Sequence, residues 1–330
     1  MNGKLQTMKI LYIQKNDAGQ RLDKFLSKAV RAMPPSLMYK SIRTKKIKVN
    51  RKRAEIGQVL CEGDIVQLFL SDDLFSAGHN ESSRLSHITP SFSVVYEDEN
   101  LILCDKPAGL QVHSDDREDT NTLINQIQAY LYQNGEYLPE SEQSFAPALC
   151  NRIDRNTAGI VIAAKNAASL RELNTLIKER KLIKKYICAV HGHMEKKSGI
   201  LTGYMTKDKD KNVVSVYEKK IPGSKDIKTG YRVIAENDEL SLLEVELFTG
   251  RTHQIRAHLA SVGHPLLGDG KYGVNRDDRK IGCKFQALYS YYLKFGGGDL
   301  LSYLSGREFS VPAEKIWFVE KFFGGDDTGL

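Results

Sequence analysis

The amino-acid sequence predicts an α+β protein with two parts: a small basic α/β module near the N-terminus, and a larger body around a largely antiparallel, mixed sheet. Stretches with helical and with strand periodicity follow one another irregularly in the body, whereas a parallel sheet needs regular β-α alternation. The chain has 330 residues, which is longer than most single cores. One large domain with a smaller satellite is therefore expected.

The module is expected to contain two helices and a short sheet. Residues 21–33 place apolar side chains on one helical face and end at two prolines, after which Ser36 can cap a second helix. Strands are predicted around Val49 and over 64–70, where apolar and polar residues alternate.

The body is predicted to begin with a strand near residue 92. Further strands are expected over 159–165, 184–192, 231–237 and 240–248, with helices over 167–182 and within 249–263. The resulting domain boundaries are an N-terminal extension with a first strand over 1–15, the module over 16–72, a flexible serine-rich linker over 73–90, the body over 91–323 and a tail over 324–330. Since Met8 can be an alternative start, residues 1–7 can be an extension.

Positive charge is concentrated in the module. The net charge of the chain is +7, but residues 21–53 alone carry twelve basic residues and one acid, which leaves −4 for the remainder. Such a concentration indicates a polyanion-binding surface rather than a solvated helical face, because few acids are at hand to pair with the cations. The candidate RNA-binding residues of the module are Arg21, Lys40, Arg43, Lys45, Lys46, Lys48, Arg51, Lys52 and Arg53.

Several classes of protein are excluded by composition. No apolar run approaches the length of about 20 residues that a membrane span needs, and the N-terminus lacks a secretory pattern. The five cysteines are widely spaced and form no C-x-x-C pair, so neither a disulfide framework nor a metal site is expected. A cytoplasmic protein without a metal site is predicted, and a monomer is the default expectation.

Asp154 stands out because it lies between Arg152 and Arg155, just before an apolar strand. The ordinary aspartate pKa is about 3.9, so the side chain is a carboxylate at neutral pH, and we expect the two arginines to keep it ionised. Such a carboxylate can act as nucleophile or base, although a surface ladder of arginine and aspartate is the simpler interpretation of this pattern alone.

Two further segments contain candidate site residues. Arg251, His253, Arg256 and His258 cluster at the start of the predicted helix within 249–263, where a phosphate or a charged side chain can bind. The two histidines are five residues apart, so a zinc site is not favoured. Tyr186 follows two lysines and can stack on an unpaired base.

Together these segments resemble the RluA-type family of RNA pseudouridine synthases. The family's His-Arg-Leu-Asp-x-x-Thr-Ser-Gly pattern corresponds to residues 151–159, and its Gly-Arg-Thr-His-Gln-Ile/Leu-Arg-x-His pattern to residues 250–258. Its lysine-proline-x-glycine motif corresponds to residues 106–109, and its tyrosine motif to Lys185 and Tyr186. The resemblance covers roughly residues 91–320. The basic module resembles the S4-like (alpha-L) RNA-binding domain, and the whole resembles the RluC-type branch.

The resemblance implies a role for each candidate residue. Asp154 is implied to be the catalytic carboxylate, and Arg256 to be its ion-pair partner. Tyr186 is implied to stack on the extruded base and to serve in removing its C5 proton, Ile255 to pack against the base, and Arg152 to occupy the space that the base leaves or to contact its neighbours. Arg251 and His253 join the RNA-binding residues.

The implied substrate is RNA, in particular large-subunit ribosomal RNA or a ribosome-assembly intermediate, without a cofactor. Asn151 and Ala158 depart from the family pattern, in which histidine and serine are usual, and bear on how the RNA strand is held. Alternatives are a synthase acting on tRNA, a non-catalytic RNA-binding or assembly protein on the same fold, and a hydrolase that would pair Asp154 with Asp269 or Asp105. A DNA-binding helix-turn-helix is a further alternative for the module.

Overall fold

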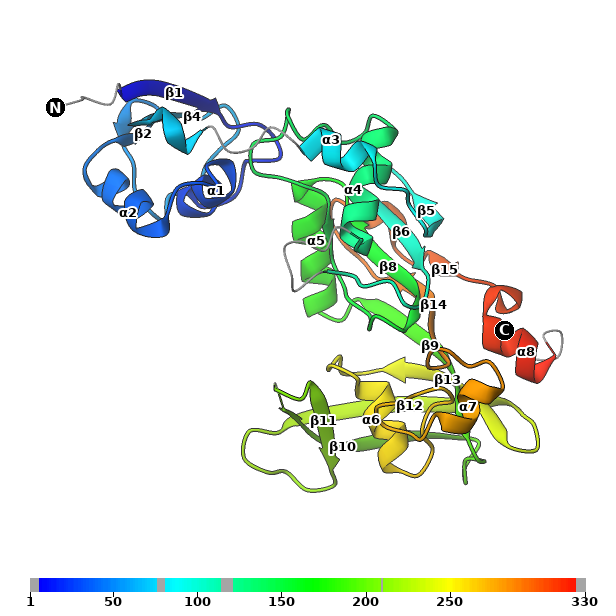
Figure 1. Ribbon diagram of the computed structural model, residues 1–330. Coiled ribbons are helices and arrows are strands. Elements are labelled where there is room, and N and C mark those ends of the chain that lie inside the picture. Colours follow the sequence, from blue (N-terminus) through cyan, green and yellow to red (C-terminus); the bar gives the residue numbers. More distant parts are fainter. Residues whose placement is uncertain (1–5, 76–80, 114–120, 209, 325–330) are drawn as a thin grey trace.

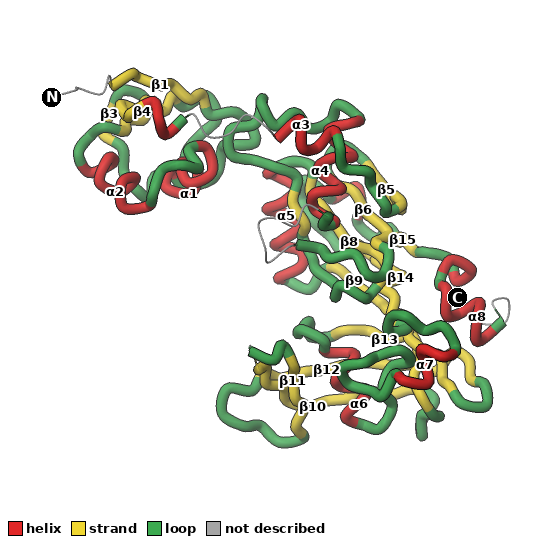
Figure 2. Tube along the Cα trace, viewed as in Figure 1, coloured by secondary structure: helices red, strands yellow, loops and turns green. Residues whose placement is uncertain are grey.

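The computed structural model describes residues 6–75, 81–113, 121–208 and 210–324. Figure 1 shows the N-terminal module at one end of the molecule and a larger body that continues away from it. In Figure 2 a long loop connects helix α6 (Gln254–Ser261) with helix α7 (Arg276–Lys280). None of the helices in the described ranges is long and apolar enough to cross a membrane.

The N-terminal module is a four-stranded antiparallel sheet with two helices packed against it. Its strands are β1 (Gln6–Tyr12), β2 (Ile47–Val49), β3 (Lys52–Arg53) and β4 (Ile65–Ser71), in the order β1-β4-β2-β3. Helices α1 (Leu22–Ala29) and α2 (Pro35–Arg43) supply Phe25 and Ile42 to a core that also contains Val66. The burial of alternate residues along β4 matches its predicted periodicity.

The second helix of the module begins differently from the expectation. Ser36 lies inside the first turn, and Pro34 is the N-cap, with Pro35 as the first helical residue. Proline suits this position because its fixed φ is helical and the N–H that it lacks would have no partner there.

A short helix lies in the segment expected to be a flexible linker. After the 3-10 turn η1 (Asp72–Leu74), residues Glu81–Ser86 form α3, and Leu85 is fully buried in the core of the body. A single apolar residue in a serine-rich segment gives no helical periodicity, so the sequence did not predict this helix. Besides the burial of Leu85, hydrogen bonds from Nε2 of Gln133 on α4 to the carbonyls of Leu85 and Ile88 hold its end.

The body is built on an eleven-stranded sheet. Its strands are β5 (Ser93–Glu97), β6 (Leu101–Lys106), β7 (Ala148–Leu149), β8 (Ala158–Ala164), β9 (Leu182–His191), β10 (Ser198–Asp208), β11 (Val213–Tyr217), β12 (Lys225–Glu236), β13 (Leu240–Leu247), β14 (Leu288–Phe295) and β15 (Glu308–Ser310). The order is β11-β10-β12-β13-β9-β14-β8-β6-β5, with β15 on β14 and β7 on β8. Among the strand pairs of the described residues, only β8–β14 is parallel, which confirms the predicted α+β class with a largely antiparallel, mixed sheet.

Helices cover both faces of this sheet. The helices of the body are α4 (Leu123–Gln133), α5 (Ala167–Lys178), α6 (Gln254–Ser261), α7 (Arg276–Lys280) and α8 (Trp317–Phe323), with 3-10 turns η2 (Ser302–Leu304) and η3 (Ala313–Lys315). Alternation along β8 sends Ile160 and Ile162 into the core with α5 and α8, and Val161 and Ala163 into the core with α4 and α6.

The β8–β14 crossing positions the loop that contains Asp154. The two strands pair at only two positions, Ala158 with Tyr289 and Gly159 with Ser290. Gly159 has φ +110°, and a Cβ there would lie 2.2 Å from the backbone oxygen of Ser290, so only glycine permits this approach. Because Ser290 also pairs with Tyr186 on β9, the end of the Asp154 loop is brought next to Tyr186.

Candidate active site

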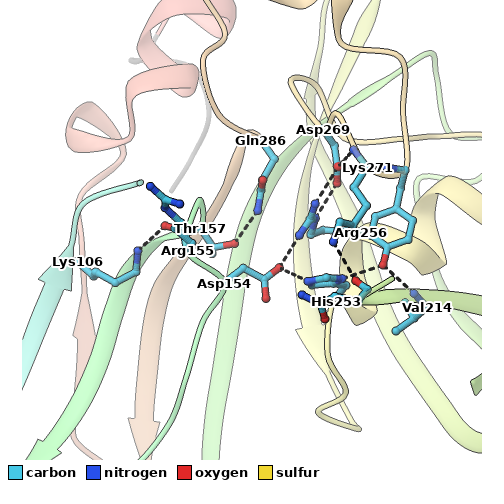
Figure 3. Close-up of polar contacts among 12 residues, drawn as sticks. Lys106, Asp154, Arg155, Thr157, Val214, His253, Arg256, Asp269, Lys271 and Gln286 are labelled. Carbon is cyan, nitrogen blue, oxygen red and sulfur yellow. Dashed lines mark hydrogen bonds and ion pairs between the residues drawn. The ribbon is translucent and has the colours of Figure 1, made fainter. Parts of the chain in front are cut away.

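Asp154 lies in the loop before β8 and is bound by an arginine that comes 102 residues later in the chain. Its Oδ2 accepts a hydrogen bond of 2.8 Å from Nη1 of Arg256, on α6. The Asp154 side chain is 26% exposed, whereas that of Arg256 is 9% exposed. The carboxylate is thus oriented from the protein side and open to solvent on the other (Figure 3).

Asp269 locks the opposite edge of Arg256. Nε and Nη2 of the guanidinium donate to its two carboxylate oxygens, at 2.7 and 2.9 Å, and Asp269 Oδ1 also accepts from the backbone N–H groups of Lys271 and Tyr272. Burial alone would raise the pKa of Asp269, but these hydrogen bonds and the charge of Arg256 hold it below its usual value. The two carboxylates in turn raise the pKa of Arg256, against the effect of burial. Arg256 is therefore held in one orientation by a bidentate pair.

His253 borders Asp154 on the side of α6. It is the N-cap of that helix in a left-handed conformation, φ 54°, and its Nε2 lies 3.8 Å from Oδ2 of Asp154. Its Nδ1 lies 2.8 Å from the hydroxyl of Tyr272, which accepts a hydrogen bond from the backbone N–H of Val214. Because the tyrosine oxygen accepts a hydrogen bond from Val214, its own hydroxyl proton is donated to Nδ1 of His253. Nδ1 is then the acceptor nitrogen, and we assign the imidazole proton to Nε2, which faces Asp154. Burial lowers the pKa of His253, so the neutral ring dominates at pH 7.

Lys106, the last residue of β6, binds the backbone of the loop that contains Asp154. Its fully buried ammonium group donates to the backbone carbonyls of Pro107 (2.8 Å), Leu110 (2.8 Å) and Arg155 (3.0 Å). Burial lowers its pKa to about 7, although the charges of Asp154 and Asp105 act in the opposite direction. The protonated amine supplies three N–H donors for these three carbonyl acceptors, and the lowered pKa means that part of the folded population is neutral at pH 7.

Tyr186 and Ile255 lie in the same core cluster, on the face of the sheet that carries α6. Tyr186 is 8% exposed and Ile255 4% exposed. Burial raises the pKa of Tyr186 to about 12, with a hydrogen bond from Ser290 acting against it and the charge of Asp154 adding to it. Tyr186 is therefore a phenol at neutral pH and lies within the electrostatic range of Asp154.

Comparison with known proteins gives the family of this chain. A family model described as RNA pseudouridylate synthase matches residues 100–261. An uncharacterized RNA pseudouridine synthase of Mycoplasma pneumoniae is 34% identical over 319 residues, 92% of this chain and 94% of that protein. The ribosomal large subunit pseudouridine synthase C of Buchnera aphidicola is 33% identical over 286 residues, 85% of this chain and 86% of that protein.

The chain belongs to the RluA-type family of RNA pseudouridine synthases. It is accordingly an enzyme that isomerises uridine in RNA to pseudouridine. The solved structure titled Human RNA Pseudouridylate Synthase Domain Containing 1 has the same fold, with a TM-score of 0.53 at 22% identity, over 67% of this chain and 83% of that one.

The arginines next to Asp154 in the synthase sequence do not pair with it. Arg152 and Arg155 are exposed, and Nε of Arg155 donates to the carbonyl of Gly109 at 3.1 Å. The neighbours in sequence therefore do not supply the ion-pair partner of the carboxylate. The cation that binds it comes from α6, because successive residues of an extended loop point in different directions.

Asn151 and Ala158, the two departures from the family pattern, both have structural partners. Oδ1 of Asn151 accepts a hydrogen bond of 2.8 Å from the backbone N–H of Ile162 on β8, where an asparagine oxygen fits as an acceptor. Ala158 is 5% exposed and lies in the core beneath β8. Neither side chain contacts the Asp154 carboxylate.

The remaining predicted residues lie apart from Asp154. Arg251 is exposed at the start of α6. The basic candidates of the module are exposed except Lys48, which is half-buried with its amine over the ring of Phe69, and Arg21 pairs with Asp23 at 3.0 Å. We define the module's basic surface by its exposed members that have no ion pair within the described ranges: Lys40, Arg43, Lys45, Lys46, Arg51, Lys52 and Arg53.

Sequence reasoning missed three members of the site. Asp269 was weighed only as a second acid for a hydrolase, but it binds Arg256 with both oxygens; Lys106 and Tyr272 had no role assigned. A lysine just after a buried apolar strand is a signal that could have identified Lys106. His258, in contrast, is a structural residue, since its Nδ1 lies 2.9 Å from Oγ1 of Thr229 and burial lowers its pKa to about 4. Within the described ranges no group of three metal-ligating side chains occurs.

Proposed function

We propose that the enzyme modifies uridines of large-subunit ribosomal RNA, with Asp154 as its catalytic carboxylate. The observation that carries the assignment of Asp154 is its contact with Arg256, which Asp269 fixes from the other side. A carboxylate that is oriented by a buried cation and still open to solvent can meet the sugar or base of an extruded nucleotide.

The surrounding side chains suit the remaining steps. The reaction replaces the C–N glycosidic bond of uridine by a C–C bond to C5; the C5 proton is released and N1 takes up a proton, so that the product is an isomer and no redox change and no cofactor is required. Tyr186 and Ile255 are placed to hold the base, and Tyr186 to serve in removal of the C5 proton, with the Ser290 hydroxyl as its hydrogen-bond partner. Arg152, exposed beside Asp154, is placed to contact the RNA around the extruded base.

The ribosomal substrate rests on the relatives. Three similar proteins, from Buchnera aphidicola and from two Vibrio species, are named ribosomal large subunit pseudouridine synthase C. The module's basic surface, together with Arg21, Lys48 and Arg251, supplies cations for the RNA backbone, and we assign His253 a contact with the RNA as a neutral ring. We assign the module, residues 16–72, to an S4-like RNA-binding domain, and infer a cytoplasmic monomer that acts on ribosomal RNA or an assembly intermediate.

The test is to map pseudouridines in large-subunit RNA from a strain that lacks the gene, before and after incubation with the purified enzyme. Carbodiimide labelling followed by primer extension identifies each site. New sites in the large-subunit RNA support the proposal. Sites that appear only in tRNA treated in parallel would move the substrate to tRNA, and no site in either RNA would overturn the substrate assignment.

A further inference from the structure

The N-terminal module and the body meet through a polar contact that centres on a buried carboxylate. Asp17, in the turn between β1 and α1, is 1% exposed. Its oxygens accept hydrogen bonds from the Ser144 hydroxyl (2.6 Å), from Nε2 of Gln143 (3.0 Å) and from the backbone N–H of Gln14 (3.2 Å). Two of these three donors belong to the body and one to the module.

Ser144 also accepts a hydrogen bond from the module, because Nε2 of Gln20 donates to its hydroxyl at 2.7 Å. The Ser144 hydroxyl thus donates to Asp17 and accepts from Gln20, and both of these residues belong to the module. No cation is paired with Asp17 within the described ranges; its charge is met by neutral donors. A buried carboxylate is tolerated only when such donors are correctly placed, so this contact depends strongly on geometry.

A second set of contacts joins the same turn to α5. Oδ1 of Asn16 accepts from the backbone N–H of Ala167 at 3.2 Å, and its Nδ2 donates to Glu142 at 2.7 Å. Nη1 of Arg171 donates to the carbonyl of Ala18 at 3.1 Å. Beside these contacts, a cavity of about 320 Å³ lies between α1 and residues 137–146. The module is therefore held mainly by this turn, from two directions.

The body segment that receives Asp17 continues directly into the active site. After Ser144 the chain forms β7 and reaches Asp154 ten residues later. The same segment thus connects the module contact with the catalytic loop. In Figure 1, α1 and α2 lie on the side of the module that is turned toward β10 and β11.

We propose that the Asp17–Ser144 contact is a positioning device that determines which uridine reaches Asp154, by fixing the distance and direction from the module's basic surface to the catalytic loop. RNA held on that surface then presents only nucleotides at a set spacing to the active site. A module on a free tether would add affinity for RNA but would not select among uridines. The inference rests on the proposed function, since it concerns the choice of uridine in that RNA.

The test compares Ser144→Glu with Ser141→Glu in the full-length enzyme. Ser144→Glu places a second carboxylate against Asp17, and the repulsion should separate the module from the body. Ser141 is exposed in the same connection, so Ser141→Glu adds the same charge without that contact. Small-angle X-ray scattering reports docking without reference to activity, and pseudouridine mapping on ribosomal RNA reports the choice of uridine.

We expect Ser144→Glu to enlarge the radius of gyration, to raise KM for ribosomal RNA roughly tenfold, and to spread modification over additional uridines. Ser141→Glu should have the same radius of gyration, KM and choice of uridine as the wild type. The kcat on a short oligonucleotide that contains the target uridine should be the same for the wild type and both variants. An unchanged scattering curve, or an enlarged particle with unchanged site choice, would overturn the proposal.

A second variant and an independent measurement cover the cases in which Ser144→Glu does not fold or the proposed function fails. If Ser144→Glu fails to fold by circular dichroism, Ser144→Ala removes one donor from Asp17 and should shift the same measurements in the same direction; wild-type behaviour of that variant would then overturn the proposal. If the wild type modifies no uridine of ribosomal RNA, the proposed function fails, whereas scattering still decides whether the contact holds the module.

Discussion

The Asp154 site and the module's basic surface use positive charge in opposite ways. In the site, Arg256 is buried between two carboxylates and has one orientation. On the module, seven exposed cations have no ion pair within the described ranges. A buried, fully paired cation positions a reacting group, whereas exposed, unpaired cations attract a polyanion and lose that attraction as salt is added. Chemistry and RNA binding should therefore be separable.

The largest effect is expected from Asp154→Asn, because the change removes the charge of the reacting group and keeps its size. We expect kcat to fall by about three orders of magnitude or more, with little change in affinity for RNA. Tritium release from RNA labelled at C5 of uridine measures kcat. Asp226→Asn, at an exposed position on β12, is the matched control. An Asp154→Asn enzyme with kcat near that of the control would remove Asp154 from the chemistry.

Asp269→Asn tests whether Arg256 must be locked for catalysis. The substitution weakens the bidentate pair but leaves Asp154 intact, so Arg256 and the carboxylate that it binds can shift. We expect kcat to fall up to about 10²-fold with a nearly unchanged KM. Equal losses of kcat and of RNA affinity would argue for general disruption of the site instead.

The same pair predicts a pH dependence of stability. Because the pKa of Asp269 is held below its usual value in the folded protein, the unfolded chain takes up a proton first as pH falls. The stabilisation is therefore complete above the unfolded pKa of about 3.9 and is lost as pH falls through the folded value. Urea unfolding should show that the wild type has a larger free energy of unfolding than Asp269→Asn at pH 7, and that this difference narrows below about pH 4. A gap that stays constant over this range would contradict the prediction.

Lys106→Met tests the support beneath the Asp154 loop. Three buried carbonyls lose their donor, and we expect the free energy of unfolding to fall by about 2–4 kcal/mol. The pKa of Lys106 is lowered to about 7 in the folded protein, and that of an unfolded lysine is about 10.4. Between these values the unfolded state binds more protons, so rising pH stabilises the wild type relative to its unfolded state. Urea unfolding should therefore show a larger difference in free energy of unfolding between the wild type and Lys106→Met at pH 10 than at pH 7. A smaller difference at pH 10 would contradict the prediction.

The smallest effect on chemistry is expected from Lys45→Ala with Lys46→Ala, on the module's basic surface. Each phosphate contact that is lost should reduce the slope of log affinity against log salt by about 0.7–0.9. The rate at saturating enzyme should equal that of the wild type. Filter binding over a salt series and single-turnover tritium release measure the two quantities, and a parallel loss in both would break the separation of binding from chemistry.

The sequence contained the fold class, and the resemblance implied the pair of Asp154 and Arg256 that the structure contains. It did not contain the residues that hold this pair in place. Periodicity gave the strands on both sides of Asp154, and motifs gave Asp154, Tyr186 and Arg256. The neighbours Arg152 and Arg155 were misleading, because adjacency in a loop does not make an ion pair, while Asp269 gains its role only when a turn brings it to Arg256.

The contact between module and body could not be predicted either. Asp17, Gln143 and Ser144 are ordinary polar residues in sequence, and only the packing of the turn on the body brings them into contact and buries Asp17. The helix at Glu81–Ser86 was missed for a related reason, since its one anchor, Leu85, is fixed by tertiary contacts rather than by a local pattern.

The most direct measurement of the separation between chemistry and binding is a salt series with the wild type and Asp154→Asn. RNA affinity and single-turnover tritium release at saturating enzyme are recorded at each salt concentration. We predict coincident affinity curves that fall with salt for both proteins, and tritium release by the wild type alone at a rate that salt does not change. Release by Asp154→Asn at the wild-type rate would contradict the catalytic role of Asp154, and a saturated rate that falls with salt would contradict the separation.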